Sequence, residues 1–188
     1  PCASEIANLR QVWHWAASHQ QYEELSKASD TLFWLYESRS NCREGVPLYG
    51  EAVEILQQDM KKLIPAEKEP CQLALGQALS YKGYFLFRQG KHPQAKNALQ
   101  SSLHMLESMA QGDELEAQMA LSNTQIFLGT VTSIMGDFSN GDLLLQQGLA
   151  AKKKLNDPWG AAFCLRQIGL SAQYKGDYDK AKQALEES

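Results

Sequence analysis

The sequence of 188 residues has no long apolar run and no excess of basic residues. No stretch approaches the ~20 apolar residues that cross a bilayer, and no basic-then-apolar segment precedes a cleavage site, so we expect a soluble, cytoplasmic chain without membrane contact. With 18 basic and 22 acidic residues the net charge is −4, which argues against a nucleic-acid-binding face. The longest basic run, Lys152 to Lys154, is expected to end a helix, where lysines favour the negative pole of the helix dipole.

The cysteines and histidines are few and scattered. None of the four cysteines (Cys2, Cys42, Cys71 and Cys164) forms a Cys-x-x-Cys pair, and their separations fit neither a zinc site nor a dense disulfide framework. We expect reduced, structural thiols, with Cys42 and Cys164 packed against neighbouring helices. The two closest histidines, His14 and His19, are off the i, i+4 spacing that would chelate a metal ion.

Sequence motifs of catalysis are also absent. There is no Gly-x-x-x-x-Gly-Lys-Ser/Thr phosphate loop and no Gly-x-Gly-x-x-Gly, and no nucleophile stands beside an evident base. The recurring Gly-Asp pairs are typical of a helix end followed by a helix cap. The sequence therefore predicts a chain that is not an enzyme, with no cofactor and no metal site.

What the sequence does contain is helical periodicity, with no alternation of the kind that marks a strand. The end of the chain shows it best, as two short amphipathic helices around a break at Gly176 and Asp177, with Asp177 as the cap of the second. The small and large residues that face each other across this pair are Leu165, Ile168, Gly169, Ala172, Tyr178, Ala181 and Leu185. Small residues at Gly169 and Ala181 should let the two helices approach closely.

The same landmarks recur upstream. Gly83, Gly129 and Gly169 correspond to one another, at intervals of 46 and 40 residues. The corresponding turn glycines, small residues and leucines are Gly90, Gly136 and Gly176; Ala95, Gly141 and Ala181; and Leu99, Leu145 and Leu185. A degenerate copy runs from Phe33 to Ala52, with Ser40 at the turn, Gly45 as the small residue and Tyr49 as the large one.

This pattern resembles the tetratricopeptide repeat (TPR) family, whose plain repeat is 34 residues long. The lengthened period is similar to the arrays of maltose-activator-type bacterial transcriptional regulators and multidomain signal-transduction ATPases, and residues 5–16 resemble the helix with which such arrays begin. The resemblance implies an all-α fold, a right-handed α-α superhelix (a TPR-like solenoid) of about nine antiparallel helices. Each helix pair should be covered only by its neighbours, so that stability is a nearest-neighbour sum.

The repeat boundaries follow from the helix start and stop signals. A single repeat domain is expected over 1–188, with a leading helix at 5–19 and repeats at about 22–64, 70–111, 113–155 and 158–188. Asn41, Asp113 and Asp157 are expected caps, and the segment 64–70, with a proline near each end, is the expected linker. Pro47 predicts a kink or a helix that begins later, near Gly45. Because the chain begins with Pro1 and ends inside an expected helix, we expect it to be part of a longer protein.

In the TPR family the first helix of each repeat lines a concave groove. Projecting the groove positions onto this chain gives Lys27, Asp30 and Trp34; Gln77, Tyr81, Tyr84 and Arg88; Asn123, Phe127 and Thr130; and Arg166, Gln167 and Tyr174. Aromatic rings beside Arg and Gln suit a peptide, a helix or a sugar-like ligand. The alternative is that rings such as Tyr84 and Phe127 only pack against the next repeat. The Lys and Asn of the family's carboxylate clamp are missing, because Asp30, Trp34, Ser80 and Tyr84 occupy those places.

The leading hypothesis is a non-catalytic protein-interaction or effector-sensing segment of a larger bacterial signalling or transcriptional regulator. Its partner would be a protein, a peptide, another domain of the same parent chain or a small effector, and dimer contacts are expected at the exposed C-terminal repeat. A stand-alone adaptor is the alternative, and a helical enzyme or DNA-binding regulator is a third.

Overall fold

The computed structural model describes residues 3–39, 42–112 and 114–188. Over these ranges the chain is all-helical and contains no strand, which confirms the all-α prediction. The thiol of Cys2, the expected turn residue Ser40 and the expected caps Asn41 and Asp113 lie outside the described residues. Among the helices that are described, none has the length and apolarity needed to cross a membrane.

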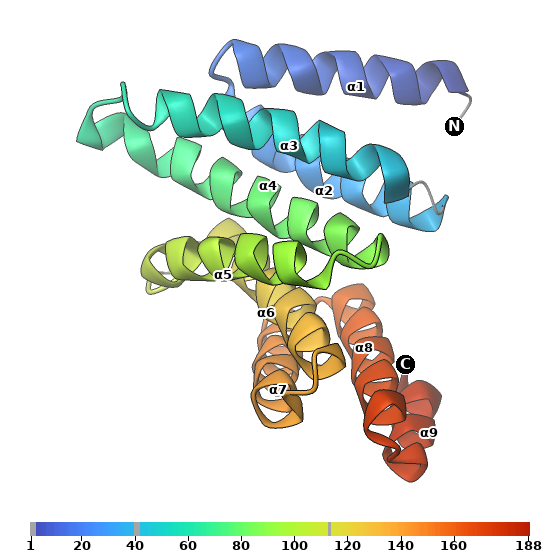
Figure 1. Cartoon of the computed structure of the whole chain (residues 1–188). Helices are drawn as coiled ribbons and strands as arrows, with labels where there is room; N and C mark the ends of the chain where they lie inside the picture. The colour runs from blue at the N-terminus through green and yellow to red at the C-terminus, as the bar shows by residue number, and fades with distance from the viewer. Residues whose placement is uncertain (1–2, 40–41, 113) are drawn as a thin grey trace.

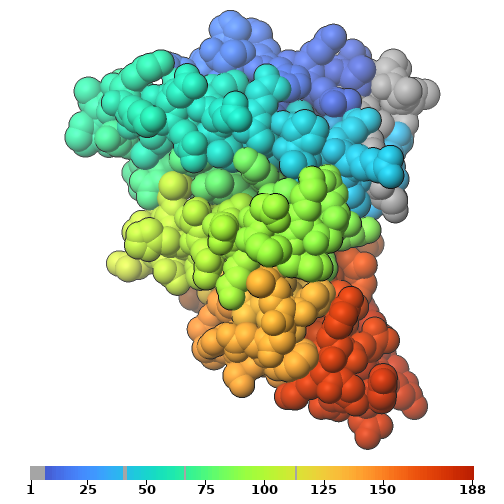
Figure 2. All heavy atoms as spheres, in the orientation of Figure 1, coloured from blue at the N-terminus to red at the C-terminus, as the bar shows by residue number. Residues whose placement is uncertain are grey.

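The described residues contain nine α-helices and one short 3-10 helix. In Figure 1, α1 lies at the top, α2 to α5 follow below it, and the pairs α6/α7 and α8/α9 lie side by side at the bottom. The α-helices are α1 (Ala3–Ser18), α2 (Tyr22–Ser38), α3 (Cys42–Asp59), α4 (Lys68–Arg88), α5 (His92–Met109), α6 (Leu115–Ile134), α7 (Phe138–Lys154), α8 (Pro158–Lys175) and α9 (Tyr178–Glu187), and the 3-10 helix is η1 (Pro65–Glu67). With all atoms drawn, the segments form successive bands along the molecule (Figure 2).

The boundaries around α3 and α4 differ from those expected. Helix α3 begins at Cys42 and carries Pro47 in its interior. Of the two alternatives expected at Pro47, the start near Gly45 is therefore wrong, and the kink stays a prediction. The proline costs the helix one hydrogen bond, which is offset by the buried face that α3 presents to its neighbours. The expected linker at 64–70 lies earlier than predicted, because α3 ends at Asp59, η1 fills part of the connection and α4 already begins at Lys68. Pro70 then lies in the first turn of α4, where an amide hydrogen is not needed.

The turns between paired helices repeat the same geometry. Gly90, Gly136 and Gly176 have φ angles of 75°, 95° and 81°, which a residue with a side chain rarely adopts. After each glycine the next amide donates back to the helix just ended, from Lys91 to Leu86 O at 3.0 Å, from Asp137 to Thr132 O at 3.1 Å and from Asp177 to Ala172 O at 2.9 Å. The predicted equivalence of the three turns is confirmed.

The caps predicted at Asp157 and Asp177 are also confirmed. Asp157 Oδ1 accepts a hydrogen bond from the Gly160 amide at 2.8 Å, and Asp177 Oδ1 accepts one from the Lys180 amide at 3.1 Å. Each bond satisfies one of the free amide groups at the start of a helix.

The predicted close approach within each pair is present. A Cβ atom added to Gly83, Gly129 or Gly169 would lie 2.6, 2.9 or 3.0 Å from Cγ of Leu99, Leu145 or Leu185, respectively. Each glycine thus faces the leucine that the repeat pattern pairs with it, and a larger residue would push the two helices apart.

Helices α2, α4, α6 and α8 contact one another in succession and form what we call the inner layer, whereas α3, α5, α7 and α9 pack against its helices from outside. Hydrogen bonds fix the register within the inner layer. Ser26 pairs with Gln77, Asp30 with Tyr81 and Glu37 with Arg88, each pair separated by 51 residues. A constant separation means that α2 and α4 run parallel. The inner layer thus brings together side chains from four helices that are distant in sequence.

Candidate functional site

An aromatic cluster lies at the centre of the inner layer. It contains rings from all four of its helices: Phe33 of α2, Tyr81 and Tyr84 of α4, Phe127 of α6 and Phe163 of α8. Ring centroids are 4.6 Å apart for Phe33 and Tyr81, and 4.7 Å apart for Tyr84 and Phe127. All five side chains are buried, so this cluster is part of the hydrophobic core.

Two side-chain contacts join α2 to α8 across the inner layer. The rings of Trp34 and Phe163 meet edge to face with centroids 5.5 Å apart, and Arg166 Nη2 lies 3.4 Å from Glu37 Oε1. Trp34 remains 43% exposed and so covers the edge of the cluster. We expected each helix pair to contact only the next pair along the chain. That expectation is incomplete, because side chains of α2 and α8, the first and last inner helices, are also in contact.

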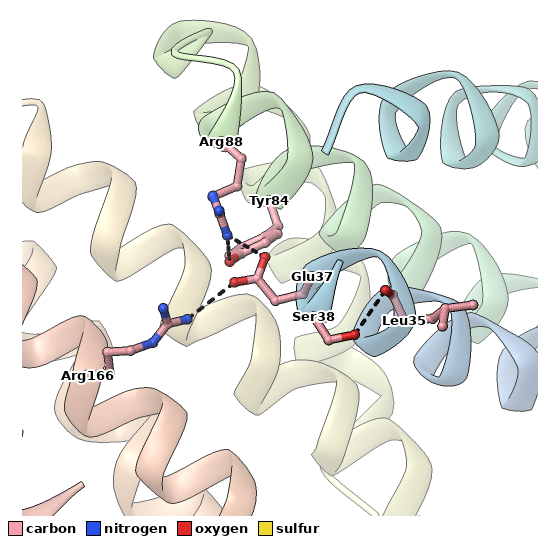
Figure 3. A network of polar contacts seen from close by, with 6 residues as sticks. All are labelled: Leu35, Glu37, Ser38, Tyr84, Arg88 and Arg166. Atoms are coloured by element: carbon pink, nitrogen blue, oxygen red, sulfur yellow. Dashed lines mark hydrogen bonds and ion pairs between the residues drawn. The ribbon is translucent and has the colours of Figure 1, made fainter. Parts of the chain in front are cut away.

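Glu37 is the centre of a polar network that joins α2, α4 and α8 (Figure 3). Its carboxylate accepts hydrogen bonds from the guanidinium groups of Arg88 and Arg166, and Arg88 Nη1 also donates to the hydroxyl of Tyr84 at 2.9 Å. The Glu37 side chain is only 12% exposed, whereas those of Arg88 and Arg166 are 31% and 51% exposed. Each guanidinium also stacks on a ring, at 5.8 Å from the centroid of Tyr84 and 4.9 Å from that of Phe163.

Burial and neighbouring charges shift the pKa values of two members of this network, Tyr84 and Arg88. Burial raises the pKa of Tyr84, and the nearby Glu37 carboxylate raises it further, so the phenol stays protonated. Burial acts to lower the pKa of Arg88, but Tyr84 and Glu37 more than offset this effect and the net shift of the pKa is upward. Two permanent cations therefore share one carboxylate, and the network carries excess positive charge.

A cleft of about 250 Å³, which we call the arginine cleft, lies beside this network. Its walls are the inner helices α4 and α8 and the outer helix α9. The residues that line it are Tyr84, Phe87, Arg88, Arg166, Gln167, Leu170, Gln173 and Leu185. Guanidinium and amide donors stand beside apolar walls. This combination can hold an anionic group attached to an apolar one.

A second polar cluster lies deeper in the inner layer. The Tyr81 hydroxyl donates to Asp30 Oδ1 and accepts from Asn123 Nδ2 at 3.3 Å. Burial raises the pKa of Asp30, and the hydrogen bond from Tyr81 and the charge of Lys152 oppose that rise only in part. Over the described residues no group of three His, Cys, Asp or Glu side chains could hold a metal ion. The hydrogen bond between the Tyr81 hydroxyl and the Asp30 carboxyl group joins α4 to α2.

The described cysteines are not placed for chemistry either. Cys71 and Cys164 are fully buried, and burial raises their pKa values to about 11 and about 12. Both remain thiols at neutral pH and are poor nucleophiles. The prediction that Cys164 is packed in the core is confirmed, and Cys42 is half-buried.

The residues projected onto a groove divide into three groups. The buried ones pack inside the chain and are Gln77, Tyr81, Tyr84, Phe127, Thr130 and Gln167. Asp30 and Asn123 are half-buried, and the exposed ones are Lys27, Trp34, Arg88, Arg166 and Tyr174. Arg88, Arg166, Tyr84 and Gln167 meet at the arginine cleft, whereas Lys27 borders a different cleft. That any of them contacts a partner stays a prediction.

Sequence reasoning missed Glu37, which joins the two arginines, and Phe163, which joins α8 to the aromatic cluster. A signal for Glu37 was present, because it follows Lys27, Asp30 and Trp34 at helical spacing on one face of α2. Comparisons with protein-family models and with curated proteins find no match for this chain.

Proposed function

We propose that this chain is a non-catalytic recognition module of the TPR type, a right-handed superhelical array whose inner layer binds a protein segment or a small effector. The observation that carries the proposal is the arginine cleft. There, two partly exposed guanidinium groups share the single carboxylate of Glu37 beside an apolar wall. The repeated glycine–leucine pairs and turns support the assignment to the repeat type.

The chemistry of this cleft favours an acidic ligand. Each guanidinium has five N–H donors in a fixed fork, and one carboxylate cannot satisfy both forks. A carboxylate of the ligand would accept hydrogen bonds from guanidinium N–H groups that Glu37 leaves unused, and Glu37 would stay in place. An apolar side chain next to that carboxylate would contact Leu170 and Leu185. We therefore propose an acidic peptide, or a small acidic effector, as the ligand.

The test is a titration of the protein with a short fluorescein-labelled peptide of alternating leucine and glutamate, followed by anisotropy. The variant Arg88→Gln/Arg166→Gln should bind about tenfold more weakly, because two charge-assisted hydrogen bonds are lost. The matched control is Lys175→Gln/Lys182→Gln, which removes the same charge at exposed positions on α8 and α9. Equal affinity of the two double variants would contradict the proposal.

For the wider role, we propose that the module is a segment of a larger cytoplasmic bacterial signalling or transcriptional regulator, in which ligand binding is passed to an effector domain. This part rests on the resemblance to lengthened repeats. A thermal-shift screen with nucleotides, metal ions and duplex DNA tests the competing classes, since a clear rise in melting temperature with any of them would favour an enzyme or a DNA-binding protein.

A further inference from the structure

A second cleft, of about 470 Å³, lies at the other end of the inner layer, where α2, α4 and α6 begin. The residues that line it come from the first turns of α2, α4 and α6 and from the end of α5. We call it the glutamate cleft, because Glu23, Glu69, Glu114 and Glu116 line it. Lys27 is the only basic residue among the residues that line it.

The charges of these glutamates are not neutralised within the described part of the chain. None of the four takes part in an ion pair there, and all four are exposed. Glu23, Glu69 and Glu116 lie in the first turns of three helices, where they favour the positive pole of the helix dipole. The dipole accounts for acidic residues at each helix start. It does not account for an open apolar cleft between them.

The apolar part of the cleft is accessible. Leu115 is 56% exposed at the start of α6, and it stands beside Leu73, Met109 and Pro70. A large exposed apolar side chain inside a concavity, rather than on a convex surface, is the arrangement that a complementary side chain can cover.

We infer that the glutamate cleft is a binding site for a cationic protein segment, in which a large apolar side chain enters the cleft and flanking lysine or arginine side chains pair with the glutamates. The cleft provides both halves of this recognition, apolar side chains for burial and a mostly acidic lining for orientation and fast association. The inference goes beyond the proposed function, because it uses a different cleft and a ligand of opposite charge.

The experiment uses short fluorescein-labelled peptides of alternating leucine and lysine, leucine and glutamate, and serine and lysine, with anisotropy at low salt. The wild-type protein should bind the leucine–lysine peptide more tightly than the serine–lysine peptide. The variant Glu23→Gln/Glu69→Gln/Glu116→Gln should bind the leucine–lysine peptide about tenfold more weakly than the wild type does. Its affinity for that peptide should also depend less on the salt concentration. The variant Leu115→Ser, which changes no charge, should bind the leucine–lysine peptide severalfold more weakly and bind the serine–lysine peptide with unchanged affinity.

The control is Glu54→Gln/Glu107→Gln/Asp179→Asn, which makes the same change of charge at exposed positions on α3, α5 and α9, away from the cleft. Equal affinity of the two triple variants, or no binding of the leucine–lysine peptide by the wild type, overturns the inference. Leu115→Ser keeps the test valid if the cleft triple variant does not fold. The leucine–glutamate peptide reports on the arginine cleft separately, so that the failure of one site is distinguishable from the failure of the other.

Discussion

Glu37 of α2 and Arg166 of α8 are 129 residues apart in sequence, yet Glu37 Oε1 and Arg166 Nη2 lie 3.4 Å apart. Glu37 also binds Arg88 of α4, so one carboxylate contacts three of the four inner helices when its own is included. The contact joins the first and last helices of the inner layer beside the arginine cleft, which Arg88 and Arg166 line.

The two arginines should contribute unequally to stability. Arg88→Ala should lower the free energy of unfolding by about 1–2 kcal/mol, because it removes hydrogen bonds to Glu37 and Tyr84. Arg166→Ala should lower it by less than about 1 kcal/mol, because its ion pair is longer and more exposed. Urea unfolding of both variants in low salt makes the comparison. A larger loss for Arg166 would mean that the contact between α2 and α8 is worth more than its geometry indicates.

Glycine positions should differ according to the space around them. At Gly129 a Cβ atom would lie 2.9 Å from Gly141 O, so Gly129→Ala should destabilise the chain by about 1–3 kcal/mol. Gly50 is the control, because its nearest contact would be the flexible Lys82 side chain at 3.8 Å, and Gly50→Ala should stabilise α3 by up to about 1 kcal/mol. Thermal unfolding followed by circular dichroism measures the stability of both variants. If the two substitutions changed stability in the same direction, the close approach of α6 and α7 at Gly129 would not be what makes alanine unfavourable there.

The buried pair of Lys152 and Asp157 should respond asymmetrically to substitution. Lys152 Nζ lies 2.8 Å from Asp157 Oδ2, with the side chains 2% and 21% exposed. Asp157→Asn leaves a buried ammonium group without a carboxylate and should cost about 3 kcal/mol, whereas Lys152→Met should cost much less, since Asp157 is partly hydrated and still caps α8. Urea unfolding at neutral pH compares the two variants. Similar losses in the free energy of unfolding would show that water reaches the ammonium group of Lys152 despite its low exposure.

Asp30 should make stability fall as pH rises. Burial raises its pKa in the folded state above the unfolded value, so between these two values the folded chain binds more protons than the unfolded chain. The free energy of unfolding therefore decreases with pH across that window, and above it this group gives a constant loss of stability that no longer changes with pH. Asp30→Asn keeps an acceptor for Tyr81 and removes the titration. The free energy of unfolding of Asp30→Asn, relative to that of the wild type, should rise with pH through the window when both are measured by urea unfolding. If the free energies of the two proteins change with pH in parallel, the pKa of Asp30 is not raised.

Local features of the fold could be predicted from sequence, and contacts between distant helices could not. The turns at Gly90, Gly136 and Gly176 and the cap at Asp157 depend on a few neighbouring residues, and each was predicted. The glycine–leucine pairs follow from a repeat within one helix pair. The α3 boundary was missed because local rules at Pro47 do not include the packing of the buried face of α3.

The site was only partly predictable for the same reason. Groove positions projected from the repeat pattern include Arg88 and Arg166, but the pattern does not state how closely α2 approaches α8. That approach depends on small rotations summed over several helix pairs. It decides that Trp34 meets Phe163, and that Glu37 joins the two arginines.

The three hydrogen-bonded pairs with a common separation of 51 residues limit how this molecule can move. Sliding α2 along α4 by one helical turn, about 5.4 Å, would break all three pairs at once. The two helices are therefore expected to shift as one rigid unit. Hydrogen bonds from Asn123 to Tyr81 and from Thr124 to Ser80 also join α4 to α6. Any flexing that admits a ligand would then be concentrated between α6 and α8.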